Sequence, residues 1–374
     1  MDFDFTENQG VLRKSARQFL TGKCPTSLVR SVEESGVGYG AELWEKMAEL
    51  GWPSLAVAEE FGGGGGTFLD VCILVEEMGR ALAPVPFIPV VLSQYAIMEA
   101  GSAEQKKKLL PDLASGKLKM TLGLYESGFS FDPAAIKTGA SRKGDQYILK
   151  GEKQLVPFGL IADAYLIAAR VGKGAKSALG LFLVDRNARG LTASGARVIG
   201  GEELARVRLD GVSVGEDGVV GGAGEGERIL KSLIQRGAVL KCAEMIGGAQ
   251  WVLDKTVEYA KERVQFNQPI GSFQAVQHRC ANMALICDGA RFASYQAAWL
   301  KGEGLPCERE VAIAKAWLSE AYTRICLDAH QVHGAIGFTK EYDLYLYTKR
   351  AKAAELAFGD ARHHYEALAN CMGL

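Results

Sequence analysis

ERVQFNQPIGSFQAVQ, residues 262–277, interrupts a long run of helical sequence and decides how the C-terminal part of the chain is arranged. It contains Pro269, and the only other proline after Pro157 is Pro306. Both prolines fall where the helical spacing of apolar residues breaks, because proline lacks the backbone N–H that a helix interior needs. Between the breaks lie amphipathic stretches at about 226–264, 272–302, 308–334 and 341–370. Helices of ~30 residues, each ~45 Å long, predict a four-helix bundle.

The sequence upstream of the bundle changes twice in character. Residues 121–225 contain short β-like runs at a spacing of roughly 10 residues, which predicts an antiparallel β-sandwich or barrel. These runs are DQYILKGEKQLVP, AYLIAAR, ALGLFLVD, ARVIG and ARVRLDGVSV. Residues 1–120 have apolar residues at helical spacing and a Thr cap before the first helix. We therefore expect an α+β multidomain protein with an N-terminal helical domain at 1–120, a central β domain at 121–225 and the C-terminal bundle at 226–374.

Three stretches rich in small residues favour packing and loops over ligand binding. The pentaglycine at 62–66 and GKGAKS at 172–177 lack the spacing of a phosphate-binding loop, so we predict that both are ordinary loops. GGA at 247–249 would let another helix approach closely, either within the subunit or between subunits. The five histidines have no metal-ligand company, and no metal site is expected.

Composition and charge exclude several classes of protein. A net charge of −1 without a basic stripe argues against nucleic-acid binding. The longest apolar run, APVPFIPVVL at 83–92, is broken by three prolines, so no membrane-spanning helix is expected. The eight cysteines show no CxxC pairs, and the acidic start MDFDFTENQG has no basic region typical of a secretory signal. We expect reduced, mostly buried thiols and a cytoplasmic protein.

Several segments resemble the acyl-CoA dehydrogenase family. Residues 262–277 are similar to its signature R-x-x-F-G-x-P-I-x-x-F-Q-x-x-Q, and QVHGAIGFTKEYDLYLYTKRAK at 331–352 is similar to a second signature. GSAEQKKKLLPDLASGK and GDQYILKGEKQLVPFG extend the resemblance over the whole chain. It implies FAD-dependent α,β-oxidation of acyl-CoA thioesters in a tetramer, with each FAD between two subunits. It also implies an electron-transferring flavoprotein as the electron acceptor.

The resemblance assigns one half of an FAD site to the bundle. Arg263 matches the arginine that binds the pyrophosphate, for which a guanidinium is suited because it can bind a diphosphate through two hydrogen bonds. At the glycines, the missing side chain lets the main chain approach the cofactor. The implied cofactor-binding residues are Arg263, Gln265, Phe266, Gln274, Gln331, Gly334 and Gly337. Arg236 matches a substrate-binding arginine on the first bundle helix.

The other half of the FAD site departs from the family pattern. Tyr125 replaces the threonine that hydrogen-bonds the flavin, and Phe131 replaces a serine near the acyl-CoA. Leu155, Pro157 and Phe158 replace a Trp, a Thr and an Asn beside the flavin ring. These changes remove hydrogen-bond donors and add bulk, and Pro157 also lacks a backbone N–H. Several such losses together indicate that no flavin ring lies in this subunit's own pocket.

The catalytic carboxylate is absent from both positions that the resemblance implies. Phe358 stands where the family most often has its glutamate, and Gln235 stands at the alternative position before Arg236. Glu355 and Asp360 are nearby carboxylates that could replace the base. General-base catalysis is worth about 10²–10⁴ in rate, so a dehydrogenase does not ordinarily discard it.

Three hypotheses follow from this pattern. The first is a base-less subunit that completes the FAD site of a related catalytic chain in an α2β2 tetramer. The second is a self-sufficient flavoenzyme, working as a homotetramer, with altered chemistry such as decarboxylation or with its base moved to Glu355 or Asp360. The third is a CoA-ester-binding or structural scaffold without a redox role.

Overall fold

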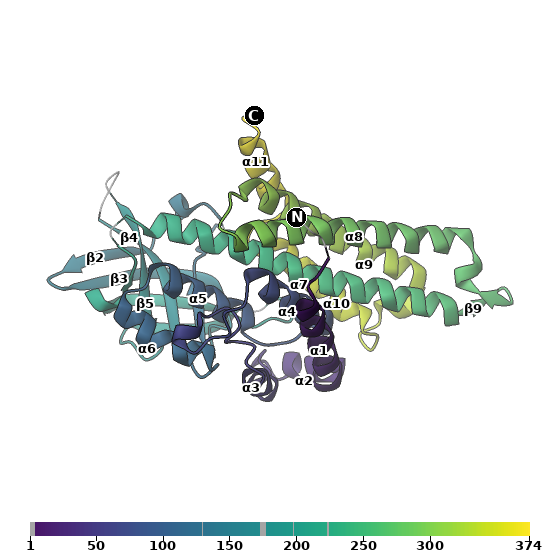
Figure 1. Cartoon of the computed structure of the whole chain (residues 1–374), viewed down its shortest axis with the longest axis horizontal. Coiled ribbons are helices and arrows are strands. Elements are labelled where there is room, and N and C mark those ends of the chain that lie inside the picture. Colours follow the sequence, from purple (N-terminus) through teal and green to yellow (C-terminus); the bar gives the residue numbers. More distant parts are fainter. Residues whose placement is uncertain (1–3, 129, 173–176, 197, 223) are drawn as a thin grey trace.

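The computed structural model describes residues 4–128, 130–172, 177–196, 198–222 and 224–374. Figure 1 shows N-terminal helices beside a β-sheet at one end of the molecule and long bundle helices that extend to the other end. The N-terminal helices are α1 (Glu7–Lys23), α2 (Thr26–Glu34), α3 (Ala41–Glu49), α4 (Phe68–Ala81), α5 (Phe87–Ala100) and α6 (Ala103–Ala114). The predicted order of helical, β and helical regions is confirmed.

Local signals explain where the N-terminal helices begin. The Thr6 hydroxyl accepts from the backbone N–H of Gln9, whose side chain accepts from the Thr6 N–H in return, which starts α1 as the Thr cap predicted. The proline-broken run at 83–92 is the start of α5, which the sequence pattern did not reveal. Pro86 precedes this helix and Pro89 lies in its first turn, where no intrahelical N–H bond is needed. None of the described helices is long and apolar enough to cross a membrane.

The central region is a mixed sheet of strand order β6-β7-β3-β2-β4-β5-β8, with β1 also paired to β4. The β1–β4 and β2–β4 pairings are parallel, which the expectation of a wholly antiparallel domain did not include. ARVIG is not a strand in the part that the structure describes, since β6 ends at Ala196 and β7 begins at Leu204. The strands are β1 (Met120–Gly123), β2 (Gly139–Lys143), β3 (Gln146–Pro157), β4 (Ala164–Val171), β5 (Ala178–Asp185), β6 (Leu191–Ala196), β7 (Leu204–Gly215) and β8 (Val219–Val220).

Strand β4 is apolar on both faces because each face packs on a different core. Leu166 and Ala168 belong to the large core shared with the helices, whereas Tyr165 and Ile167 belong to a separate core within the β region. Of the two stretches expected to be loops, the pentaglycine is one, while residues 173–176 of GKGAKS lie outside the described residues.

The bundle consists of α7 (Gly226–Glu262), α8 (Gln274–Gly302), α9 (Glu308–His333), α10 (Leu344–Leu356) and α11 (Ala361–Cys371). The fourth predicted helix is therefore wrong as one piece, because the chain leaves helical geometry at Phe358 and Gly359, with φ of 57° and 102°. Asp360 then starts α11 by accepting a 2.9 Å hydrogen bond from the His363 N–H. This break positions Phe358.

The small residues of α7 pack within the subunit. A Cβ on Gly247 would lie 1.8 Å from the carbonyl oxygen of Glu76 on α4, and one on Gly248 would lie 2.1 Å from the Tyr322 hydroxyl on α9. Both contacts exclude any larger side chain without rearrangement. The close approach that GGA predicts is thus between helices of the same chain.

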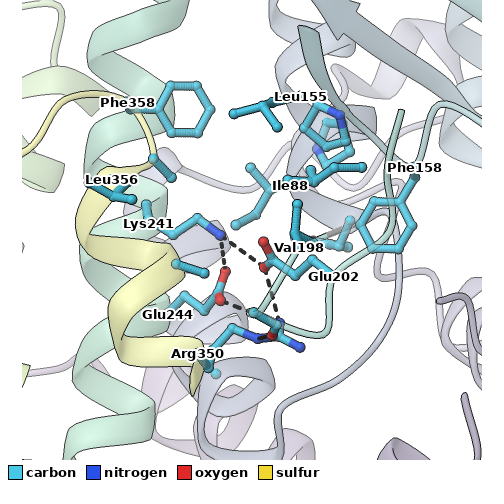
Figure 2. A pocket seen from close by; sticks show the side chains of 18 of the residues that line it. Ile88, Leu155, Phe158, Val198, Glu202, Lys241, Glu244, Arg350, Leu356 and Phe358 are labelled. Carbon is cyan, nitrogen blue, oxygen red and sulfur yellow. Dashed lines mark hydrogen bonds and ion pairs between the residues drawn. The ribbon is translucent and has the colours of Figure 1, made fainter. Parts of the chain in front are cut away.

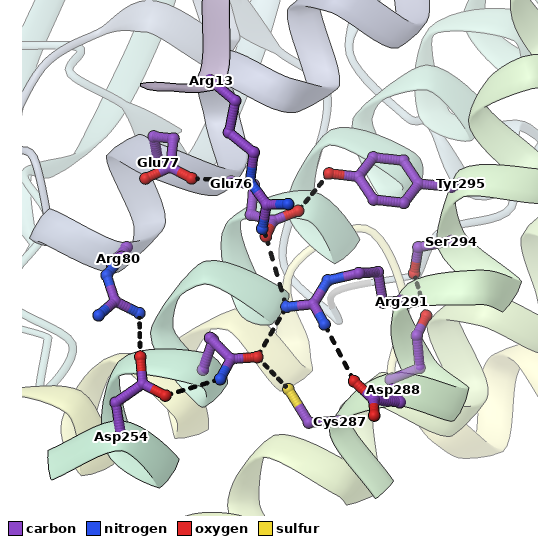
Figure 3. Close-up of polar contacts among 12 residues, drawn as sticks. Arg13, Glu76, Glu77, Arg80, Asp254, Cys287, Asp288, Arg291, Ser294 and Tyr295 are labelled. Atoms are coloured by element: carbon purple, nitrogen blue, oxygen red, sulfur yellow. Dashed lines mark hydrogen bonds and ion pairs between the residues drawn. The ribbon is translucent and has the colours of Figure 1, made fainter. Parts of the chain in front are cut away.

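Buried charges connect the N-terminal helices to the bundle (Figure 3). Glu76 and Glu77 of α4 are 2% and 1% exposed. Glu76 pairs with Arg13 of α1 at 2.7 Å and with Arg291 of α8 at 3.5 Å, and Glu77 pairs with Arg17 of α1 at 2.7 Å. These carboxylates therefore fix three helices relative to one another.

Candidate functional site

An internal cavity of about 620 Å³ lies where the N-terminal helices, the sheet and the bundle meet. This volume is within the range of cavities that bind small molecules and cofactors. Its walls are mostly apolar and come from α4, α5, β1, β3, α7 and α10. Figure 2 shows Phe358 and Leu155 on one side and a group of charged side chains on the other.

On the side of the cavity that carries Phe358 and Leu155, the Phe358 ring lies directly over Gly237 of α7. A Cβ on Gly237 would be 2.3 Å from Cε1 of the Phe358 ring, so no side chain fits at 237 beneath this ring. Gly237, not Gln235, is therefore the α7 residue that faces Phe358. Gln235 instead accepts a 2.7 Å hydrogen bond from the Lys301 ammonium and contacts Glu308 at 3.5 Å.

Arg236 is not among the residues that line this cavity, and its expected role in substrate binding stays a prediction. Its guanidinium lies 4.2 Å from the ring centroid of Tyr95 and 5.3 Å from that of Phe68. It lines a separate pocket with Lys301 and Cys307. A contact between Arg236 and a ligand in the cavity of Phe358 would require this stacking to be broken.

Two buried side chains, Lys315 and His364, form hydrogen bonds with the backbone of the turn that carries Phe358. The Lys315 ammonium donates to the carbonyl oxygens of Glu355 at 2.9 Å and Gly359 at 2.7 Å. His364 Nε2 donates to the Phe358 carbonyl oxygen at 2.9 Å. Burial lowers the pKa of Lys315 to about 8 and that of His364 to about 4. His364 is therefore neutral at pH 7.

Of the two candidate replacement carboxylates, only Asp360 reaches the cavity. Glu355 is engaged elsewhere, because its carboxylate accepts from Thr323 at 3.1 Å and from Lys352 at 2.8 Å. Asp360 lines the cavity, but one of its oxygens caps α11. This carboxylate is therefore already engaged in a hydrogen bond within the chain.

Four charged residues on the other side of the cavity, Glu202, Lys241, Glu244 and Arg350, form an ion cluster that the sequence reading missed (Figure 2). The Lys241 ammonium lies 2.7 Å from Glu244 and 3.3 Å from Glu202, and Arg350 lies 3.0 Å from Glu202. Burial raises the pKa of Glu202, but the two cations outweigh burial and lower it to about 2. Charged residues three apart in the apolar stretch AVLKCAEMIGGA are the signal that could have revealed it.

The residues expected to bind FAD lie at the opposite end of the molecule. Arg263 precedes the hairpin of β9 (Val264–Gln265) and β10 (Gln268–Pro269), which Figure 1 shows at the end of the bundle remote from the sheet. Tyr259 stacks on His333 with ring centroids 4.4 Å apart, which brings the ends of α7 and α9 together. The structure thus gathers the two signatures at one end. Six of the seven residues are exposed there: Arg263, Gln265, Phe266, Gln274, Gln331 and Gly334.

Gly337 is the exception, because it is buried and a Cβ there would lie 3.1 Å from both His330 and His333. Its missing side chain serves packing inside the subunit. Phe266, in contrast, is 86% exposed at the tip of the hairpin. Arg263 makes no ion pair with the residues that the structure describes. An exposed aromatic ring beside an unpaired guanidinium is suited to a ligand or partner outside this chain.

Comparison with known families identifies the family to which this chain belongs. Models of the acyl-CoA dehydrogenase N-terminal, middle and C-terminal domains match residues 6–117, 121–212 and 224–372. The chain belongs to the acyl-CoA dehydrogenase family. Members of this family are FAD-dependent oxidoreductases, which confirms the expected cofactor and enzyme class at family level.

Individual relatives cover nearly the whole chain. Probable acyl-CoA dehydrogenase YngJ of Bacillus subtilis is 32% identical over 367 residues, with 96% of each chain covered. Subunit CarC of the caffeyl-CoA reductase-Etf complex of Acetobacterium woodii is 30% identical over 346 residues, covering 90% of this chain and 91% of CarC. A solved structure of a variant of the Tcur3481-Tcur3483 steroid ACAD is 31% identical, with a TM-score of 0.89 and 98% of each chain covered.

Three residues expected beside a flavin ring, Leu155, Pro157 and Phe158, line the cavity without a side-chain hydrogen-bond donor. The Tyr125 hydroxyl also lines it and is buried without a hydrogen-bond partner among the described residues. The rings of Tyr125 and Phe131 lie 5.2 Å apart and fill the space beside Phe358. A flavin edge left without partners there would cost roughly 1–3 kcal/mol per group. The bundle end, in contrast, presents the exposed side chains of Arg263 and Phe266.

Proposed function

We propose that this chain is a base-less subunit of a hetero-oligomeric acyl-CoA dehydrogenase and completes the FAD site of a related catalytic chain. The observation that carries the proposal is the packing of Phe358 on Gly237. These residues face each other where a carboxylate would have to act, and neither has a group that accepts a proton. Loss of the base in this chain is tolerated if the partner keeps one.

The separation of the two half-sites supports a shared cofactor. The cavity lies beside the sheet, whereas Arg263 and the hairpin lie at the far end of the bundle (Figure 1). One copy therefore does not bring its hairpin to its own cavity. A partner of the same fold would receive the hairpin beside its flavin pocket, and two chains of each kind would form an α2β2 tetramer with two FAD.

Each exposed residue at the bundle end has a physical role in this proposal. Arg263 binds the pyrophosphate, for which its planar guanidinium is suited. Gln265, Gln274 and Gln331 offer amide groups to the adenosine, and Phe266 offers a ring for stacking. The Gly334 backbone approaches the cofactor from the end of α9. When bound in the partner, FAD accepts the hydride that leaves the acyl-CoA.

An electron-transferring flavoprotein is the proposed electron acceptor of the complex. CarC is named as a subunit of a complex with Etf, and its similarity covers 90% of this chain. The paired name of the Tcur3481-Tcur3483 steroid ACAD supports a partner chain. The acyl group itself is left open by these relatives.

Co-expression tests the proposal. The chain is purified alone and together with its proposed partner, and the visible spectrum is recorded before and after addition of acyl-CoA. We expect the chain alone to be colourless and the complex to bind about one FAD per two chains. Yellow colour that acyl-CoA bleaches in the chain alone would reject the proposal.

Arg263→Ala tests the donated half of the site. We expect this variant to assemble with the partner but to lose FAD from it, because a diphosphate loses its bidentate partner. Arg362→Ala is the matched control, since Arg362 is also an exposed arginine, 87% exposed on α11. An FAD content equal to that of the control would contradict the role of Arg263.

A second candidate function rests on Asp360, which lines the cavity. A self-sufficient enzyme could use Asp360 as its base, or could release carbon dioxide from the α-carbon and need no base. Turnover by the chain alone that falls at least a hundredfold in Asp360→Asn would favour relocation of the base. A complex that stays colourless in every combination would favour the third hypothesis, a scaffold without a redox role.

A further inference from the structure

The ion cluster is unexpected in a cavity with apolar walls. Lys241 and Arg350 have side chains that are each 7% exposed, and burying charges costs free energy that pairing only partly restores. On α7, the cluster residues Lys241 and Glu244 are flanked by buried Leu240 and Met245. The four residues pair with one another, but Glu244 Oε1 is buried and has no hydrogen-bond partner among the described residues. An unpartnered acceptor in a cavity wall indicates a ligand with a polar group that donates a hydrogen bond.

The loop between β6 and β7 closes this end of the cavity through the same cluster. Glu202 pairs with Lys241 and Arg350, and Arg350 also donates from Nε to the Gly200 carbonyl oxygen at 3.2 Å. A Cβ on Gly200 would lie 2.4 Å from the Ala353 side chain, so the loop lies directly on α10. The charged groups are thus held in fixed positions, which a specific hydrogen bond to a ligand requires.

The two carboxylates of the cluster, whose side chains are more exposed than those of the two cations, define the chemistry of that group. Glu202 is 20% exposed and Glu244 is 12% exposed, compared with 7% for each of the two cations. A ligand in the cavity therefore meets carboxylates, which accept hydrogen bonds. The cluster contains two cations and two anions, so a ligand carboxylate would gain no net attraction. A hydroxyl donates to a carboxylate, and its burial costs much less free energy than the burial of a charged group.

We propose that this cavity binds an elongated apolar ligand that carries a hydroxyl group at the end remote from Phe358, where the hydroxyl donates to the carboxylates of the ion cluster. The apolar walls between Phe358 and the cluster contact the body of the ligand. This inference goes beyond the proposed function, because it concerns the cavity of this chain and not the FAD site of a partner.

Three CoA thioesters of matched chain length test the inference. Decanoyl-CoA, 10-hydroxydecanoyl-CoA and 9-carboxynonanoyl-CoA are titrated into the full-length chain by calorimetry. We expect the hydroxylated thioester to bind about tenfold more tightly than the other two, which is the effect of one good hydrogen bond to a charged group. Equal binding of all three, tighter binding of the carboxylate, or binding of none would overturn the inference.

A charge-neutral double variant shows whether the cluster causes the preference. Lys241→Met/Glu244→Gln removes one cation and one anion, and we expect the preference for the hydroxyl to fall below about threefold. The matched control is Lys255→Met/Glu258→Gln, which removes an exposed pair with the same spacing on the same helix, 2.8 Å apart. The control should keep the full preference. A preference that persists in the cluster variant would overturn the inference.

Glu244→Gln alone keeps the size of the side chain and is the second variant if the double variant does not fold. Circular dichroism shows whether Glu244→Gln folds. In the folded variant, the preference for the hydroxylated thioester should fall at least threefold, and an unchanged preference would overturn the inference. The FAD content of the complex with the partner is measured in parallel. It should be unchanged in Glu244→Gln, so failure of this inference and failure of the proposed FAD role are separate results.

Discussion

At the residue scale, the proposal of a base-less subunit depends on the contact between Phe358 and Gly237. From the sequence motif near the end of the bundle, we predict that Phe358 replaces the catalytic carboxylate. On α7, however, the motif indicates Gln235 as the corresponding position, whereas the structure shows Gly237 there. Successive helix residues are rotated by about 100°, so a difference of two positions turns the side chain to nearly the opposite face. Only the structure shows which α7 residue faces Phe358.

Gly237→Ala should destabilise the protein although alanine is the better helix former. The new Cβ would be 2.3 Å from the Phe358 ring, and displacing this ring should cost about 1–3 kcal/mol, more than the ~1 kcal/mol that alanine gains in a helix. Urea unfolding measures the difference. In a Phe358→Ala background the same substitution should become stabilising.

Gly289→Ala is the control for this prediction. Gly289 also lies inside a bundle helix, α8, but its nearest neighbour, Trp317, is at an ordinary 3.6 Å. This variant should gain up to about 1 kcal/mol. If Gly237→Ala were stabilising to the same extent, the ring would not occupy the position that the structure gives it.

His364 should make stability depend on pH between about 4 and 6.5. Burial lowers its pKa in the folded protein to about 4, whereas the unfolded chain takes up this proton near pH 6.5. The unfolded state therefore binds more protons in this window, and stability is lost as the pH falls from 6.5 to 4, by up to about 3 kcal/mol. Urea midpoints at pH 7 and pH 4.5 measure the loss.

His364→Gln keeps a donor for the Phe358 carbonyl oxygen and should lose the part of the pH dependence that His364 contributes. Burial also lowers the pKa of His330, His333 and His363, so their part should remain. His278→Gln, at an exposed position, should keep the full pH dependence. A pH dependence that is the same in both variants would show that His364 is not the titrating group.

At the element scale, the helices and strands were largely predictable, and the connections between them were not. Thr6 and the apolar spacing predicted α1, but the proline-rich start of α5 looked like a broken run. The fourth bundle helix was expected to be continuous, because its apolar spacing continues across Phe358. The break depends on Lys315 and on the Asp360 cap, and the Lys315 contact joins residues far apart in the sequence. The parallel pairings of the sheet are equally non-local.

Helix α1 should depend on Glu77 for its attachment. Arg13 and Arg17 both pair with this carboxylate, which is 1% exposed, so Glu77→Gln leaves two arginines with a weaker acceptor. Because both arginines are partly exposed, we expect a loss of about 1–3 kcal/mol in place of the full cost of a broken buried pair. Limited proteolysis should then cut α1 faster. Glu258→Gln, at an exposed pair, should leave the rate of cleavage unchanged.

At the scale of the whole molecule, the family and the exposed half-site were accessible from the sequence because their motifs are continuous. The ion cluster was not, since it joins Glu202, Lys241 and Glu244, and Arg350 from three separate parts of the chain. The sequence also could not show that the hairpin lies at the end of the bundle remote from the sheet (Figure 1), whereas the cavity is lined by residues of β1 and β3 and by Lys241 and Glu244 of α7. That separation is a property of the three-dimensional arrangement alone.

Phe266→Ala should leave the stability of this chain almost unchanged but reduce the retention of FAD in the complex with the partner. The ring is 86% exposed, so its loss should change the free energy of unfolding of this chain by no more than about 0.5 kcal/mol. We expect the complex with the partner to retain less FAD, measured by absorbance after desalting. Val11→Ala, 63% exposed on α1, is the control for both measurements. Unchanged FAD retention would show that the hairpin tip lies outside the cofactor site.

The packing of Phe358 on Gly237 also constrains how this lineage could regain a base. A glutamate at 237 has no room while the aromatic ring is present, because even a Cβ would overlap it. Replacement of Phe358 must therefore come first on any mutational path that places a carboxylate at position 237. An intermediate with a small residue at 358 would have an enlarged cavity and still no base. Such a step would have no catalytic advantage for selection to act on.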